Sequence, residues 1–391
     1  MMFILILFIF LIELLIQSKV SCNNVIRQLS ISCSISNETY NALYTFYNST
    51  NGNNWSTNCK SNWNFQSNNS QPCSEQNPWY GITCNDCQIT ELDLFSCNLQ
   101  GTIPTDLGNL TNMTFLGLIK NNLQGTIPSE LGNMKNMISF ALRNNNLQGT
   151  IPSELGNMNN TINFALNNNN LQGTIPSELG NMKNMTLFVL NNNNLQGTIP
   201  TFLCTFYSLQ GLSLQDNHLF GSIPIDLMNM SSLIQIDLSN NKQLTGDLNT
   251  FFNSSNRLKL QSIVLGNLSL VGSLSDTLFN LKSIDTIVLS SNCLTGTLSD
   301  SICSSLTLST FILNGGYSTL TCKSAKSKQR FQGSIPSCIF SLSKLQTLHL
   351  AGNGLYGTIP NTLSNSSLLN DLNLAGNRLT GIYSNNYIYA D

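Results

Sequence analysis

Few side chains in this sequence have the type and spacing that catalysis requires. The only histidines, His218 and His349, are not accompanied by a hydrolase nucleophile motif. Several carboxylates are expected to project from strands, but most are too far apart for paired-carboxylate catalysis, which needs roughly 5–10 Å. These residues are Glu91, Asp93, Asp216, Asp237 and Asp371. No phosphate loop or dinucleotide fingerprint occurs. We therefore expect a protein that is not an enzyme and has no cofactor.

The twelve cysteines favour disulfides over metal binding. Five of them crowd into one N-terminal stretch, at Cys59, Cys73, Cys84, Cys87 and Cys97. The close pair in Cys84-Asn85-Asp86-Cys87 has no second pair at zinc-ligand spacing, so we expect no metal site.

Charged residues make up only 9% of the chain and the net charge is −2. Nucleic-acid binding by counterion release needs many clustered lysines and arginines, so we expect no nucleic-acid partner. The single basic cluster is short and is interpreted as a solvated loop. It consists of Lys323, Lys326, Lys328 and Arg330.

The N-terminus predicts export. Residues 2–16 form an apolar run interrupted only by Glu13, and small residues that could frame a cleavage site follow at 18–22. We assign residues 1–22 to a signal peptide, with an uncleaved anchor as the alternative. No later segment approaches the length of a membrane span. A secreted or cell-surface location makes the asparagine sequons usable for glycosylation. Candidates are Asn37, Asn54, Asn109, Asn184, Asn253 and Asn365.

A glycine register recurs along most of the chain. Gly-Thr-Ile-Pro begins at Gly101 and returns every 24 residues up to Gly197, and related registers continue to Gly357. A fixed step of this size is typical of a solenoid whose coils bury one another.

Each repeat contains a Leu-x-Leu segment, as at Leu116–Leu118, and there are twelve such segments. Alternation directs the two apolar residues inward and the residue between them outward, which predicts a strand. Three residues further on, an asparagine fills nine of twelve positions, for example Asn121 and Asn169. A buried asparagine there can satisfy backbone groups where the coil turns. The Gly-x-Ile-Pro turn then leads into a short helical or 3₁₀ turn with proline near its start.

This pattern resembles the plant-type leucine-rich repeats of receptor-like kinases and polygalacturonase-inhibiting proteins. The resemblance covers about residues 40–381, and the Trp- and Cys-containing segment before the first repeat resembles the N-terminal cap of that family. It implies a Cys73–Cys84 disulfide, and a curved α/β repeat solenoid. In that fold one long parallel sheet lines the concave face, and short helical turns form the convex face.

The domain organisation follows from these features. We expect a cap at residues 23–88, about twelve repeats at 89–381 and a short C-terminal end at 382–391. An insertion near residues 315–327 interrupts the repeats and holds Cys322, which could be bonded to Cys303 or Cys338. Such loops often carry specificity, although a tolerated insertion is the alternative.

The outward face of the predicted strands is the candidate binding surface. The first coils combine aromatic, aliphatic and cationic residues, a composition enriched in binding hot spots. The later coils place three aliphatic residues in line, which suggests contact with a partner. The candidates are Phe95, Phe115, Ile119, Lys120, Arg143, Val264, Val288 and Ile312.

The middle coils are nearly identical and are expected to present asparagines, among them Asn163, Asn167, Asn168, Asn191 and Asn192. We interpret the chain as an extracellular recognition protein that binds a protein, peptide or glycan on its concave sheet. The alternative is a structural or adhesive surface protein whose regular polar array binds a polysaccharide or ice.

Overall fold

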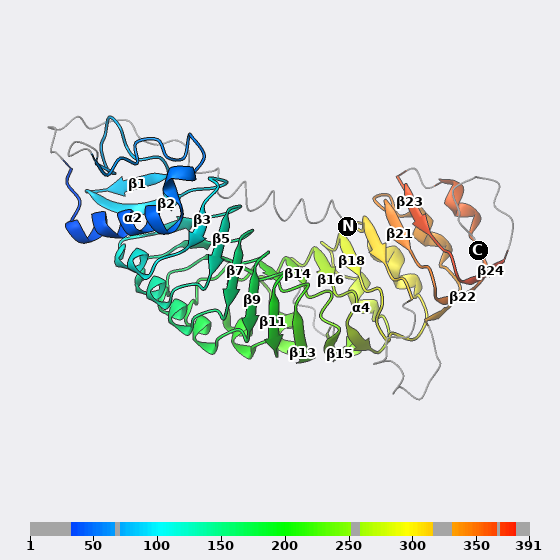
Figure 1. Cartoon of the computed structure of the whole chain (residues 1–391). Coiled ribbons are helices and arrows are strands. Elements are labelled where there is room, and N and C mark those ends of the chain that lie inside the picture. Colours follow the sequence, from blue (N-terminus) through cyan, green and yellow to red (C-terminus); the bar gives the residue numbers. More distant parts are fainter. Residues whose placement is uncertain (1–32, 67–70, 252–258, 316–330, 366–367, 381–391) are drawn as a thin grey trace. The chain divides into compact units, whose positions relative to one another are not determined.

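The computed structural model describes residues 33–66, 71–251, 259–315, 331–365 and 368–380 (Figure 1). The chain divides into two compact units between residues 33 and 34, and every helix and strand of the described residues belongs to the second. The predicted signal peptide, most of the insertion with Cys322 and the basic cluster, Asn253 and the C-terminal end lie outside the described residues.

A long sheet runs through the second unit. Its first strand, β1, pairs antiparallel with β2, and from β2 onward the described part of the sheet contains twelve parallel strands, as the twelve Leu-x-Leu segments predicted. The order follows the chain: β1 (Ile82–Asn85), β2 (Gln88–Asp93), β4 (Phe115–Gly117), β6 (Ser139–Ala141), β8 (Asn163–Ala165), β10 (Leu187–Val189), β12 (Gly211–Ser213), β14 (Gln235–Asp237), β16 (Ser262–Val264), β18 (Thr286–Val288), β19 (Thr310–Ile312), β21 (Thr347–His349) and β23 (Asp371–Asn373). We call it the main sheet.

A second sheet, which the sequence pattern had not revealed, is formed by the segments that lead into each Gly-x-Ile-Pro turn. Its strands are β3 (Gln100–Thr102), β5 (Asn122–Gly125), β7 (Asn146–Gly149), β9 (Asn170–Gly173), β11 (Asn194–Gly197), β13 (His218–Ser222), β15 (Gln243–Asp247) and β17 (Ser269–Val271). Three further strands, β20 (Gln332–Gly333), β22 (Gly354–Thr358) and β24 (Arg378–Thr380), pair in the same way near the C-terminus.

Short helical turns close each coil, as predicted. Most are 3₁₀ turns with proline at the preceding position, where its fixed φ suits the entry, as at Pro128 with φ −65°. They are η2 (Thr105–Asn109), η3 (Ser129–Asn133), η4 (Ser153–Asn157), η5 (Ser177–Asn181), η6 (Thr201–Thr205), η7 (Ile225–Asn229), η8 (Asp300–Ser304), η10 (Ser337–Ser341) and η11 (Asn361–Asn365).

Three turns lack the proline. Two of them form the short α-helices α3 (Leu248–Phe251) and α4 (Asp276–Phe279), and the third forms η8. Ser275 and Ser299 cap α4 and η8 by accepting hydrogen bonds from the backbone N–H groups of Thr277 and Ser301. These side-chain caps satisfy N–H groups that a helix start leaves open.

The predicted asparagines hold successive coils together. The amide nitrogen of Asn169 donates to the carbonyl of Leu166 in its own coil and to that of Leu142 in the preceding coil. Its amide oxygen accepts from the backbone N–H of Leu147. The same pattern recurs at Asn145, Asn193, Asn217, Asn241, Asn292 and Asn377. We call this series the asparagine ladder.

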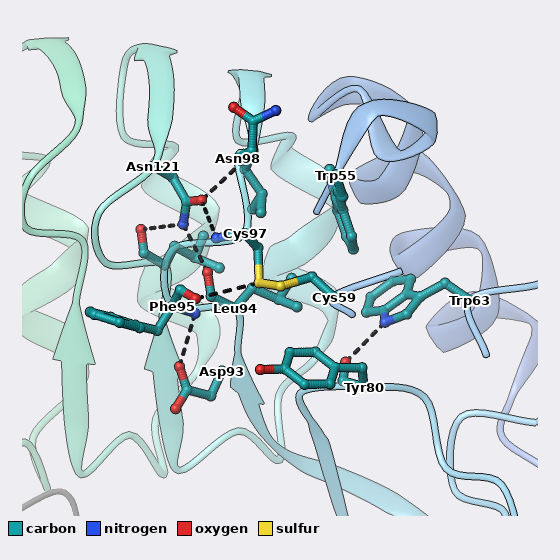
Figure 2. Close-up of a disulfide and its surroundings, with 12 residues drawn as sticks. Trp55, Cys59, Trp63, Tyr80, Asp93, Leu94, Phe95, Cys97, Asn98 and Asn121 are labelled. Atoms are coloured by element: carbon teal, nitrogen blue, oxygen red, sulfur yellow. Dashed lines mark hydrogen bonds between the residues drawn. A yellow bond between two sulfur atoms is a disulfide. The ribbon is translucent and has the colours of Figure 1, made fainter. Parts of the chain in front are cut away.

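The N-terminal cap consists of α2 (Asn37–Ser49), η1 (Gly52–Asn54) and an aromatic cluster. Trp55 and Trp63 pack edge-to-face with ring centroids 4.9 Å apart, and Trp63 donates its indole N–H to the carbonyl of Tyr80. A Cys59–Cys97 disulfide joins the cap to the first coil (Figure 2). The expected Cys73–Cys84 disulfide is present and joins two parts of the segment before the first repeat, with Cys84 on β1. The apolar side of the first coil is thereby covered.

Candidate ligand-binding surface

An exposed aromatic and cationic pair stands on the outward side of the first coils. Phe95, just after β2, is 43% exposed, and the Nζ atom of Lys120 in the next coil lies 5.2 Å from the centroid of its ring. Lys120 takes a left-handed backbone conformation, with φ 55°. A cation over an aromatic face contributes about 0.5–1 kcal/mol at exposed sites. The pair thus presents an ordered apolar and cationic surface.

Asp93 lies beside Phe95, and Phe115 lies near Asp93 at Gly117. In the register of β2 and β4, Asp93 stands next to Gly117, where a Cβ would come within 2.7 Å of the Phe115 ring and 3.1 Å of the Asp93 carboxylate. The missing side chain of Gly117 therefore leaves room for both groups. Burial raises the pKa of Asp93, while a hydrogen bond from the backbone N–H of Phe95, seen in Figure 2, acts in the opposite direction.

Two of the predicted binding residues are not displayed as we expected. Ile119 and Arg143 are both buried, each with 3% exposure. Both belong to one row with Phe95, because the coils hydrogen-bond from Ser96 to Ile119 and from Lys120 to Arg143. At a strand spacing of about 4.8 Å, large neighbours in such a row cover one another. The alternation of residues along each strand predicted which way these side chains point, but it did not predict how exposed they are.

The later coils present the predicted aliphatic row. Val264, Val288 and Ile312 are in register on β16, β18 and β19, and all three are partly exposed. The row continues into His349 on β21. The Nε2 atom of His349 lies 2.7 Å from a carboxylate oxygen of Asp371, so the apolar row ends in a polar pair.

The middle coils differ from our expectation. Asn163, Asn168 and Asn192 are partly exposed, whereas Asn167 and Asn191 are buried. The Ser213 hydroxyl lies 3.0 Å from the amide oxygen of Asn191, so that amide is engaged within the protein.

One carboxylate in this region titrates abnormally. Burial and, to a smaller extent, the negative charge of Asp216 raise the pKa of Asp237 to about 6, against the effect of hydrogen bonds from the side chain and backbone of Ser239. Among the described residues, no three His, Cys, Asp or Glu side chains gather as a metal-binding group.

One disulfide contradicts a predicted pairing, and another had not been predicted. Cys303 and Cys338 bond to each other, so a bond from either of them to Cys322 in the insertion is ruled out. Cys84 and Cys87 are both in disulfides and are not available to zinc. The Cys59–Cys97 pairing was not predicted, because sequence spacing does not determine connectivity.

The candidate glycosylation sites fall in several places. Asn37, Asn54, Asn109 and Asn184 are exposed. Asn365 ends η11. Within the described residues, no helix is both long and apolar enough to span a membrane.

Comparisons with known proteins agree with this fold. The leucine-rich-repeat profile matches residues 88–110, 136–158, 160–182, 208–230 and 344–366. No curated protein matches the chain's sequence. The solved structure of PEPR1 with AtPEP1 has a TM-score of 0.71 and 27% identity, over 88% of this chain and 49% of that one. The plant peptide hormone receptor RGFR1 in complex with RGF2 has a TM-score of 0.57 and 30% identity, over 72% and 50%.

A plant ice-binding protein has a TM-score of 0.61 and 22% identity, over 90% of this chain and 97% of that one. At that identity the likeness shows the fold alone. The chain spans about half the length of the two receptor structures. Together with the asparagine ladder and the paired sheets, these matches define a plant-type leucine-rich-repeat protein. Its disulfides and its likeness to receptor ectodomains indicate an extracellular protein.

Proposed function

We propose that this chain is a secreted, non-catalytic recognition protein that binds a peptide or protein segment along the outward face of its main sheet. The observation that carries the proposal is the exposed Phe95 with Lys120 above its ring, near one end of the main sheet. Aromatic and cationic residues held in fixed positions bind with little loss of conformational entropy. The partly exposed row of Val264, Val288 and Ile312 provides a second contact further along the same sheet.

The solved structures with peptide hormones support this choice of ligand class. RGFR1 is a plant peptide hormone receptor and was solved in complex with RGF2, and it resembles this chain over 72% of this chain's length. A glycan ligand is less well supported, because neither cluster stacks several aromatic rings side by side.

Selection from a phage-displayed library of random linear peptides tests the proposal. Peptides that bind the full chain should lose at least tenfold in affinity for Phe95→Ala and for Val288→Asp. The chain offers matched controls, since Phe220 is 44% exposed and Val271 is 44% exposed on the second sheet. Phe220→Ala and Val271→Asp should bind normally. Equal losses in the controls, or peptides unaffected by Phe95→Ala and Val288→Asp, would place recognition elsewhere.

A second candidate function is binding of a regular, uncharged target. It is favoured by the near-identity of the repeats at 125–148, 149–172 and 173–196, which place the same side chains at each step. The fold likeness to a plant ice-binding protein is compatible with it. Cosedimentation of the full chain with ice or with insoluble polysaccharides, before and after removal of one 24-residue repeat, tests this candidate.

A further inference from the structure

The second sheet carries three regular columns of exposed side chains. Their members repeat every 24 residues and are all exposed. The columns are Asn122, Asn146, Asn170 and Asn194; Gln124, Gln148, Gln172 and Gln196; and Thr126, Thr150, Thr174 and Thr198. We call this surface the second-sheet face.

The coils that carry the columns have nearly the same backbone geometry. The φ angles of Gly125, Gly149 and Gly173 are 77°, 79° and 79°, and that of Gly197 in the fourth coil is 93°. Those of Pro128 and Pro152, at the following turns, are both −65°. Equal geometry in successive coils turns a repeated sequence into an evenly spaced array, with strands about 4.8 Å apart.

Each threonine is held in place by the glycine of the next coil. A Cβ on Gly149 would lie 2.8 Å from Cγ2 of Thr126, and a Cβ on Gly173 would lie 2.9 Å from Cγ2 of Thr150. The same relation joins Thr174 to Gly197 at 2.9 Å and Thr198 to Gly221 at 3.1 Å. The threonine methyl group thus occupies the space that a side chain on the next coil's glycine would take.

The polar groups of the second-sheet face are available to an external partner. Within the described residues, the hydroxyls of Thr126, Thr150, Thr174 and Thr198 make no hydrogen bond to the protein. The Asn170 amide donates to the Asn146 amide at 2.6 Å, which links these two members of their column. No column member is charged, and none begins a glycosylation sequon.

We propose that the second-sheet face binds the surface of ice. The proposal rests on the second candidate function and names its surface and its target. Ice is neutral and offers only hydrogen-bond donors and acceptors at fixed intervals, which an ordered, uncharged array of hydroxyls and amides can engage. The threonine methyl groups pack over the glycine of the next coil, so these side chains lose less conformational entropy on binding than free ones would. A sugar polymer is less well matched, because its apolar ring faces are best buried by aromatic side chains and the columns contain none.

The test uses the full chain and ice itself. We expect the protein to be taken up into slowly growing ice and to inhibit ice recrystallisation. Thr150→Lys, in the middle of its column, should reduce the ice-bound fraction at least tenfold. Thr150→Ser, which keeps the hydroxyl but removes the methyl group that packs against Gly173, should give an intermediate loss.

Thr105→Lys is the matched control, because Thr105 is exposed on η2 and lies outside the columns. It should bind ice as the unaltered chain does, and the unfolding temperature of each variant confirms that it is folded. Absence of ice uptake by the unaltered chain overturns the proposal. So does uptake that Thr150→Lys leaves intact. Binding to an insoluble polysaccharide without binding to ice overturns the proposal but leaves the second candidate function standing.

Discussion

The side-chain amide of Asn169 donates a hydrogen bond to the carbonyl oxygen of Leu142, one coil back along the solenoid and 3.1 Å away. The same amide accepts from the N–H of Leu147 at 3.0 Å. Asn169 is 7% exposed, so these backbone groups have little access to water. A buried group left without a partner costs about 1–3 kcal/mol.

We therefore expect Asn169→Ala to lower the free energy of unfolding by about 1–3 kcal/mol. Its neighbour provides the control, because Asn170 is exposed and bonds only another side-chain amide. Asn170→Ala should change the free energy of unfolding by about 0.5 kcal/mol or less. Urea unfolding of both variants measures the difference, and equal effects would show that the asparagine ladder does not stabilise the coils.

The asparagine ladder shows what a sequence of this kind predicts well. Asn121 and Asn169 could be placed because a fixed step of 24 residues assigns the same role to every equivalent position. The second sheet could not be, because a strand such as β5 buries only one side chain, that of Leu123, and a single apolar position shows no alternation. The exposure of individual side chains could not be predicted from the sequence either. Alternation gives the direction of Ile119, but its burial depends on how closely its neighbours pack.

The Cys59–Cys97 disulfide links the cap to the first coil at a place where Cys97 stands in for a ladder asparagine. The double variant Cys59→Ser/Cys97→Ser should lower the free energy of unfolding by about 2–5 kcal/mol, since the bond constrains the unfolded chain. Cys204, a free and partly buried cysteine, supplies the control. Cys204→Ser should cost under about 1 kcal/mol. Thermal unfolding under non-reducing conditions measures both, and a double variant as stable as Cys204→Ser would refute a stabilising role for this bond.

Three phenylalanine rings are stacked through the middle coils. Phe164 is fully buried, and its ring centroid lies 5.6 Å from that of Phe140 and 5.8 Å from that of Phe188. Phe164→Ala should cost about 3–5 kcal/mol because it leaves a cavity. Phe164→Leu should cost less, since more of the volume is kept.

Because each coil contacts only its neighbours, we expect Phe164→Ala to increase hydrogen exchange first in β6, β8 and β10. Phe220→Ala, at an exposed phenylalanine, is the control and should leave exchange unchanged. Exchange that rises uniformly over the whole solenoid would show that the coils unfold together and not locally.

Asp237 should make stability depend on pH. Its pKa is raised from 3.8 to about 6 in the folded chain, so the folded state holds the proton more tightly than the unfolded state. The corresponding stabilisation is complete below about pH 4 and is lost as the pH rises through about 6.

Asp237→Asn stays neutral throughout this range. The free energy of unfolding of the variant, relative to the unaltered chain, should therefore increase by about 2 kcal/mol between pH 4 and pH 7. Ser239→Ala removes the hydroxyl that donates to the Asp237 carboxylate and should move the midpoint of this transition to higher pH. Urea unfolding across the pH range measures both effects, and a pH-independent difference between Asp237→Asn and the unaltered chain would contradict the burial of this carboxyl group.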